Sequence, residues 1–149
     1  MESEVRNKTQ FSYRPTGLVE SSGAGQTTVE RTTERVEKPW GYELIFAHTE
    51  HYVGKIIHIA AGHRLSRQYH IAKDETLMVE CGELDLEIGP DNTSELIHMG
   101  RRDVFRVKPG VIHRLIGVTD VDVIEVSTTQ LDDVVRLTDD YGRQGTSAR

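Results

Sequence analysis

Four side chains with nitrogen and oxygen donors fall at spacings that β-strands can bring together. Gln68 and His70 are two residues apart and share one face of a strand, and Glu75 follows after a short turn. Glu75 also alternates with Leu77 and Val79, so it is predicted to face inward with these apolar side chains. Burying a carboxylate there is costly unless it is paired with a cation or bound to a metal. Pro109-Gly110 then sets a second imidazole, His113, at the start of a later strand. This donor set suits a divalent ion, with zinc first and manganese, iron, cobalt or nickel as alternatives.

The elements that must position these residues are short strands. Residues 83–88 alternate strictly between acidic and apolar side chains and end in the turn sequence Gly-Pro-Asp-Asn. Gly82 is predicted to be a hairpin corner, and only 131–137 shows any helical periodicity. Further strand patterns lie at 52–59, 76–81, 103–107, 113–117 and 121–126. Many short strands without crossover helices predict an all-β sandwich or barrel, most simply a jelly roll.

The chain divides into three parts by composition. Residues 1–33 are rich in small polar residues and have few apolar ones, so they predict a flexible N-terminal arm. Residues 34–143 form one domain-sized unit, and 144–149 are predicted to be a loose tail.

Composition excludes several classes of protein. The formal charge of -6 lies wholly on residues 34–149, and no long basic stretch favours nucleic-acid binding. No apolar run is long enough to span a membrane, and the first thirty residues lack a secretory h-region, so we expect a cytoplasmic protein. A single cysteine, Cys81, excludes an internal disulfide framework.

The spacing of the donor residues resembles a known pattern. His70-x4-Glu75-x6-Gly82, followed by Pro109-Gly110-x2-His113, resembles the two conserved motifs of the cupin superfamily. A narrower resemblance, to the type II mannose-6-phosphate isomerase family, rests on the segments Lys38–Glu43, Leu65–His70, Asp132–Arg136 and Asp139–Arg143. Together these segments extend over the whole predicted domain, in the family's order.

The resemblance implies a double-stranded β-helix, the jelly-roll cupin barrel. It also implies a divalent metal held by Gln68, His70, Glu75 and His113, and an aldose–ketose isomerase acting on a sugar phosphate such as mannose 6-phosphate. Some positions depart from the family pattern: the first motif continues Lys73-Asp74-Glu75-Thr76-Leu77 instead of Arg-x-Glu-His-Trp, and the second has Lys108 before Pro109-Gly110. These departures leave the predicted ligands intact but alter the pocket wall, so they bear on the substrate.

Such an isomerase needs a base that moves a proton between neighbouring carbons, and cations that hold the phosphate. Glu125 and Lys55 are the predicted catalytic residues. Arg136 and Arg143 lie in the closing motif and are the first choice for the phosphate, with Lys73 and Arg114 as further predicted substrate contacts. Each of these cations could instead only form structural ion pairs.

Two other classes of function remain open. Two histidines and a carboxylate also form the facial set of non-haem iron oxygenases, and small cupins serve as cyclases, lyases and dioxygenases of secondary metabolism. The third possibility is a small-ligand-binding module without turnover. Open strand edges also favour a homodimer that shares the N-terminal arm.

Overall fold

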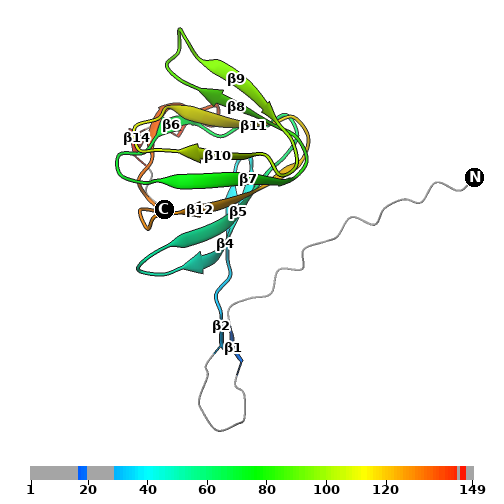
Figure 1. Cartoon of the computed structure of the whole chain (residues 1–149), viewed down its shortest axis with the longest axis vertical. Helices are drawn as coiled ribbons and strands as arrows, with labels where there is room; N and C mark the ends of the chain where they lie inside the picture. Colours follow the sequence, from blue (N-terminus) through cyan, green and yellow to red (C-terminus); the bar gives the residue numbers. More distant parts are fainter. Residues whose placement is uncertain (1–16, 20–28, 144, 147–149) are drawn as a thin grey trace, which may run out of the picture.

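The computed structural model describes residues 17–19, 29–143 and 145–146, and all regular structure in these ranges is β-strand. Twelve strands form two six-stranded antiparallel sheets that face each other (Figure 1). The all-β prediction is confirmed. The suggestion of a helix at 131–137 is wrong, because this segment consists of turns followed by a strand that pairs in a sheet. Over the same ranges there is no helix long and apolar enough to cross a membrane.

The first sheet has the strand order β10-β7-β12-β5-β4-β3. Its central strands, β12 and β5, pair over seven residues from Val121↔Ile59 to Ser127↔Val53. The strands of this sheet are β3 (Glu34–Lys38), β4 (Gly41–His48), β5 (Val53–Ile59), β7 (Glu75–Cys81), β10 (Val104–Val107) and β12 (Val121–Ser127).

The second sheet has the order β14-β13-β6-β11-β8-β9. Its strands are β6 (Arg67–Tyr69), β8 (Leu84–Ile88), β9 (Glu95–Met99), β11 (His113–Gly117), β13 (Val135–Thr138) and β14 (Gly145–Thr146). β14 falls inside the predicted loose tail, yet it pairs with β13 through Val135↔Thr146 and Arg136↔Gly145. These two residues of the tail therefore belong to the barrel.

Gly82 lies at a crossing between the two sheets. It joins β7, which pairs with β10 and β12, to β8, which pairs with β11 and β9. The prediction of a hairpin corner here is wrong, because β7 and β8 do not pair with each other. The glycine itself is required, since its φ is +83° and a Cβ would lie 2.2 Å from the carbonyl oxygen of Asp120.

The core fills the space between the sheets at one end of the barrel. Alternate residues of each strand point inward, so the pleat with its period of two selects the core side chains. The fully buried members include Ile57, Ile59, Leu77, Val79, Leu84, Leu86, Val121 and Val123. Burying a side chain of this size stabilises the fold by about 1.5–3 kcal/mol.

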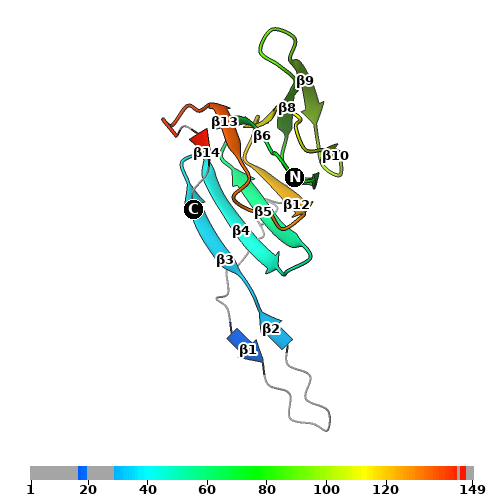
Figure 2. The same ribbon diagram turned by 90° about the vertical axis from the view of Figure 1, so that its left-hand side faces the viewer.

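The predicted N-terminal arm contains one paired ribbon. β1 (Gly17–Val19) and β2 (Val29–Arg31) pair antiparallel and form a separate two-stranded sheet. Figures 1 and 2 show this ribbon beyond the end of β3, clear of both large sheets. The rest of the arm, 1–16 and 20–28, lies outside the described residues, so its flexibility stays a prediction.

Gly82→Ala and Gly110→Ala provide a matched pair of substitutions. Both glycines have a φ of +83°, but nothing lies within 4 Å of a Cβ built on Gly110. We expect Gly110→Ala to cost about 1 kcal/mol through φ alone. Gly82→Ala should cost at least about 2 kcal/mol more, because the backbone at Asp120 and Val121 must move. Urea denaturation measures both losses, and equal losses would contradict the clash.

Candidate metal centre

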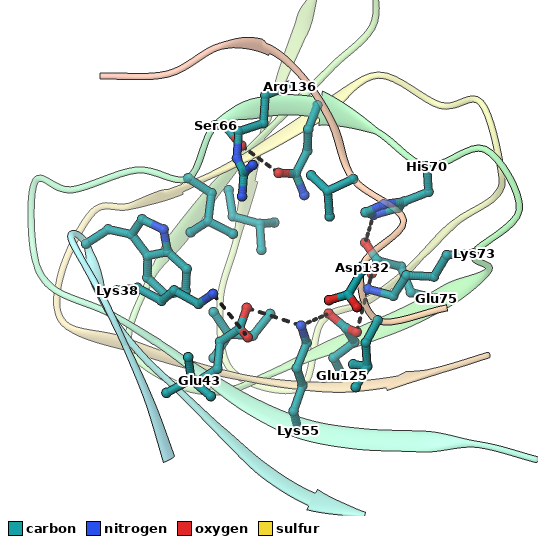
Figure 3. A pocket seen from close by; sticks show the side chains of 18 of the residues that line it. Lys38, Glu43, Lys55, Ser66, His70, Lys73, Glu75, Glu125, Asp132 and Arg136 are labelled. Carbon is teal, nitrogen blue, oxygen red and sulfur yellow. Dashed lines mark hydrogen bonds and ion pairs between the residues drawn. The ribbon is translucent and has the colours of Figure 1, made fainter. Parts of the chain in front are cut away.

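A cavity of about 630 Å³ lies between the two sheets and adjoins the apolar core, since the core residues Trp40, Ile57, Leu65, Leu77 and Leu115 form part of its lining. It is lined by side chains from both sheets and from the segment before β13 (Figure 3). Six cationic and six acidic residues line it among the described residues, so its lining is close to neutral overall. Such a density of charge inside a barrel requires specific pairing.

Three residues of the predicted metal set converge in this cavity. His70 follows β6, Glu75 begins β7 and His113 begins β11, and all three are at most 3% exposed. Glu75 Oε1 lies 3.3 Å from His70 Nε2 and 3.2 Å from His113 Nε2. One ligand atom from each lies within 4.8 Å of the others, so this cluster can hold a metal ion.

The hydrogen bonds of the Nδ1 atoms of His70 and His113 indicate that the cluster fits a bound cation. His70 Nδ1 donates to the carbonyl oxygen of Asp133 at 2.6 Å, and His113 Nδ1 donates to that of Val111 at 2.9 Å. Both Nε2 atoms therefore face the carboxylate with a lone pair, unless each ring carries a second proton. Two buried imidazolium rings beside one carboxylate would be costly, whereas a divalent ion would be coordinated by all three groups.

The fourth predicted ligand, Gln68, lines the same cavity. It lies on β6 opposite His113 in the strand register, which brings the two residues side by side. Its Oε1 accepts a hydrogen bond of 2.6 Å from Ser66 Oγ. A role for this amide oxygen as a ligand stays a prediction.

Lys73 forms an ion pair with the second carboxylate oxygen of Glu75, Oε2. Its Nζ lies 2.6 Å from Glu75 Oε2 and 2.8 Å from Glu125 Oε1. Burial alone would lower the pKa of Lys73, but the charges of Glu125 and Glu75 outweigh it and raise that pKa above its usual range. Lys73 therefore stays cationic and leaves only Oε1 of Glu75 facing the histidines.

The ion pairs continue from Glu125 along the floor of the cavity (Figure 3). Lys55 Nζ lies 3.7 Å from Glu125 Oε2 and 3.1 Å from Glu43 Oε1, and Lys38 Nζ lies 3.9 Å from Glu43 Oε2. Burial would raise the pKa of Glu43, yet the ammonium groups of Lys55 and Lys38 hold it below its usual range. Glu125 and Lys55, the predicted catalytic pair, are thus neighbours in one chain of alternating charges.

Lys38 and Glu43 line the cavity, but neither was predicted from sequence as a site residue. Both lie in the segment Lys38–Glu43, which contributed only to the family resemblance. Glu43 is two residues from the buried Ile45 on β4, so both side chains point to the inner side of the sheet. Lys55 is related to Ile57 on β5 in the same way. A charged residue at an inward-facing strand position was the sequence signal that could have identified Glu43 as a cavity residue.

Cations line the part of the cavity that lies away from His70 and Glu75. Figure 3 shows Lys38 and Arg136 there. Burial lowers the pKa of Arg136 and the Arg143 charge lowers it further, so the two guanidinium groups are close enough to repel each other. Arg143 is held by Asp139, which accepts from its Nη2 at 2.7 Å and its Nε at 3.1 Å.

The remaining predicted substrate contact, Arg114, is directed elsewhere. Its Nη2 donates to Thr138 Oγ1 at 2.9 Å, and its Nη1 lies 4.0 Å from Glu87 Oε2. Arg114 follows His113 on β11 and so projects to the opposite face of the sheet. The residue borders the cavity, but its guanidinium group points away from it.

Asp133 holds the loop of the first motif, a role that was not predicted from sequence. Its carboxylate accepts hydrogen bonds from the backbone N–H groups of Ile71, Ala72 and Lys73, at 2.9, 2.7 and 2.8 Å. The backbone carbonyl oxygen of Asp133 accepts the hydrogen bond from His70 Nδ1. Asp133 is 63 residues from His70 in sequence, so no local pattern revealed the contact.

Comparison with known proteins agrees with this geometry. The family model for the mannose-6-phosphate isomerase C-terminal domain matches residues 24–139. The chain belongs to this family. No protein in the curated set matched the sequence of this cupin.

Solved cupin structures share the fold at low sequence identity. KdgF from Halomonas sp. is 20% identical with a TM-score of 0.60, covering 67% of this chain and 91% of its own. An RmlC-like cupin from Shewanella frigidimarina is 17% identical with a TM-score of 0.59, covering 68% and 87%. Oxalate decarboxylase from Bacillus subtilis is 14% identical with a TM-score of 0.61, covering 72% of this chain and 30% of its own. These likenesses confirm the double-stranded β-helix.

Removing the Asp133 carboxylate tests how the first motif is held. Asp133→Ala loses three charge-assisted hydrogen bonds, so we expect the free energy of unfolding to fall by about 2–3 kcal/mol. Asp103→Ala is the control, because that carboxylate accepts from the backbone of Gly100 alone and should cost about 1 kcal/mol. Urea denaturation of the metal-free protein measures both, and similar losses would contradict the role of Asp133.

Proposed function

We propose that this cupin is a metal-dependent aldose–ketose isomerase of a sugar phosphate similar to mannose 6-phosphate. The observation that carries the proposal is the order of groups in one cavity. A buried carboxylate, Glu125, lies beside the metal cluster through their shared partner Lys73, and the cations Lys38 and Arg136 line the same cavity farther from the cluster. An isomerase of this class needs these three parts within the length of one sugar.

The metal is proposed to bind through His70, Glu75 and His113, with Gln68 as a fourth ligand. Zinc is the first choice for a site with two imidazoles and a carboxylate, and manganese, iron, cobalt and nickel are alternatives. One Bacillus subtilis oxalate decarboxylase structure with this fold is described as having Mn(II) centres. A bound divalent ion would stabilise the negative charge that develops on a substrate carbonyl oxygen.

Glu125 is proposed to move the proton. Its carboxylate takes the proton from the hydroxyl-bearing carbon next to the carbonyl and returns it to the former carbonyl carbon. The hydroxyl proton moves between the two substrate oxygens, so substrate and product are isomers and no proton is gained or lost overall. Lys73 and Lys55 hold the two carboxylate oxygens from either side and so fix its orientation. We propose that Lys55 also donates a hydrogen bond to the substrate, since its Nζ borders the cavity.

Arg136 and Arg143 are proposed to bind the phosphate, assisted by Lys38. The cavity lining is close to neutral, so a bound divalent ion would leave it net positive and favour an anionic substrate. Lys73, in contrast, is saturated by two carboxylates and is proposed to act on Glu75 and Glu125 instead of on the substrate.

The proposal predicts isomerisation of a phosphosugar that depends on metal and on Glu125. Purified protein is assayed for aldose–ketose conversion before and after chelation, with metal content measured in parallel. Glu125→Gln keeps the shape of the side chain but removes the base, and should lower kcat by about 10²–10⁴-fold with metal content unchanged. Absence of conversion would reject the isomerase, and oxygen consumption by the Fe(II) form would favour a dioxygenase.

Arg136→Ala tests the phosphate site separately. We expect KM for the phosphosugar to rise by about tenfold or more, since a charge-assisted hydrogen bond contributes about 1.5–3 kcal/mol. Metal content should not change, because Arg136 is not a proposed ligand and lies away from His70 and Glu75, although it pairs with Gln68 in the strand register (Figure 3). Unchanged KM would contradict the assignment of Arg136 to the phosphate.

A further inference from the structure

Asp132 lies where the cavity opens to solvent, since it both lines the cavity and is exposed. The next residue, Asp133, is directed the other way and accepts hydrogen bonds from the loop after His70. Figure 3 shows the Asp132 carboxylate on the side of the cavity that holds Glu75 and Glu125. The function proposed above gives this carboxylate no role.

The segment that carries Asp132 is anchored on both sides of it. Before it, the Thr128 N–H donates to the carbonyl oxygen of Asp74 at 3.0 Å, and the Asp74 N–H donates to Thr128 Oγ1 at 3.1 Å. After it, the carbonyl oxygen of Asp133 accepts from His70 Nδ1 at 2.6 Å. The backbone of Asp132 is therefore held one residue away from a contact with a histidine of the metal cluster.

The proposed isomerisation moves two protons, and Glu125 accounts for one of them. While the enediol exists, Glu125 carries the proton taken from carbon, so it cannot accept the hydroxyl proton at that moment. Its two oxygens also face Lys73 at 2.8 Å and Lys55 at 3.7 Å. A second acid–base group is therefore needed at the two substrate oxygens.

The other carboxylates that line the cavity are engaged or distant. Glu75 faces the two histidines and an ammonium group, and Glu43 is held by two ammonium groups. Glu34 and Glu37 lie on β3, an edge strand that β4, β5 and β12 separate from β7. Among the described lining residues, Asp132 thus combines exposure to solvent with a position beside the metal cluster.

We infer that Asp132 is a second catalytic residue, which moves the hydroxyl proton between the two substrate oxygens. This role rests on the proposed isomerase. One carboxylate oxygen of Asp132 accepts the proton as the hydroxyl O–H bond breaks. The resulting carboxylic acid donates this proton to the former carbonyl oxygen, where the new O–H bond forms. Glu125 moves the other proton from carbon to carbon, so the step needs no oxidant, reductant or net proton.

Asp132→Asn keeps the size of the side chain but removes the proton acceptor. We expect kcat for phosphosugar isomerisation to fall about 100-fold and KM to change by less than about twofold, because proton transfer is lost and binding is not. Metal content should equal that of the wild type, since Asp132 is not part of the cluster. Glu37→Gln is the matched control, because it removes a carboxylate from the same lining but on β3, and it should keep the wild-type kcat.

Formate distinguishes proton transfer from a structural role. Asp132→Ala leaves space at an exposed position for this small carboxylate, so formate should raise kcat of the variant at least about tenfold without changing that of the wild type. A folded Asp132→Asn variant with the wild-type kcat, or an Asp132→Ala variant that formate does not rescue, would overturn the role of Asp132. Either result would leave the isomerase and Glu125 standing, because the wild type converts the substrate in both comparisons. A wild type that converts no phosphosugar would reject the isomerase and this role together.

Discussion

The burial of Glu75 is the constraint on which the rest of this cupin depends. A carboxylate that is 3% exposed must be compensated, and here two imidazoles face one oxygen and an ammonium group faces the other. Lys73 in turn needs Glu125, which needs Lys55, which needs Glu43. The compensation of one buried charge therefore extends across the whole cavity.

The same strands serve the cavity and the core because a strand exposes alternate residues to one side. On β12 the inward positions are Val121, Val123 and Glu125, so two valines pack in the core and the third position reaches the cavity. The barrel is thus apolar at one end and charged at the other without any change of secondary structure. Hydrogen bonds such as those from Asp133 to the loop after His70 then hold one side of the candidate metal cluster in place.

Six barrel strands and the candidate metal cluster could be predicted from local spacing. Alternation identified β5, β7, β8, β10, β11 and β12 to within one residue at each end, but it gave no range for β3, β4, β9 or β13. The pair His70 and Glu75 with the later His113 indicated a cluster that can hold a metal. The errors arose where pairing between distant segments decides the outcome. Gly82 joins two sheets whose strands pair with distant segments, and 131–137 is held by β6, far earlier in the sequence. Residues 145–146 pair with the nearby β13, a contact that their polar composition did not indicate.

What the sequence determined alone is therefore which side chains share a face of a strand, since the period of two is a local property of the chain. The tertiary structure alone decided how those faces are used. It placed Thr138 beside the guanidinium group of Arg114, brought Lys38 and Glu43 into the cavity that His70 lines, and set Asp133 against a loop about sixty residues away. Each of these contacts depends on how two sheets are stacked and registered, which the pattern within one strand does not specify.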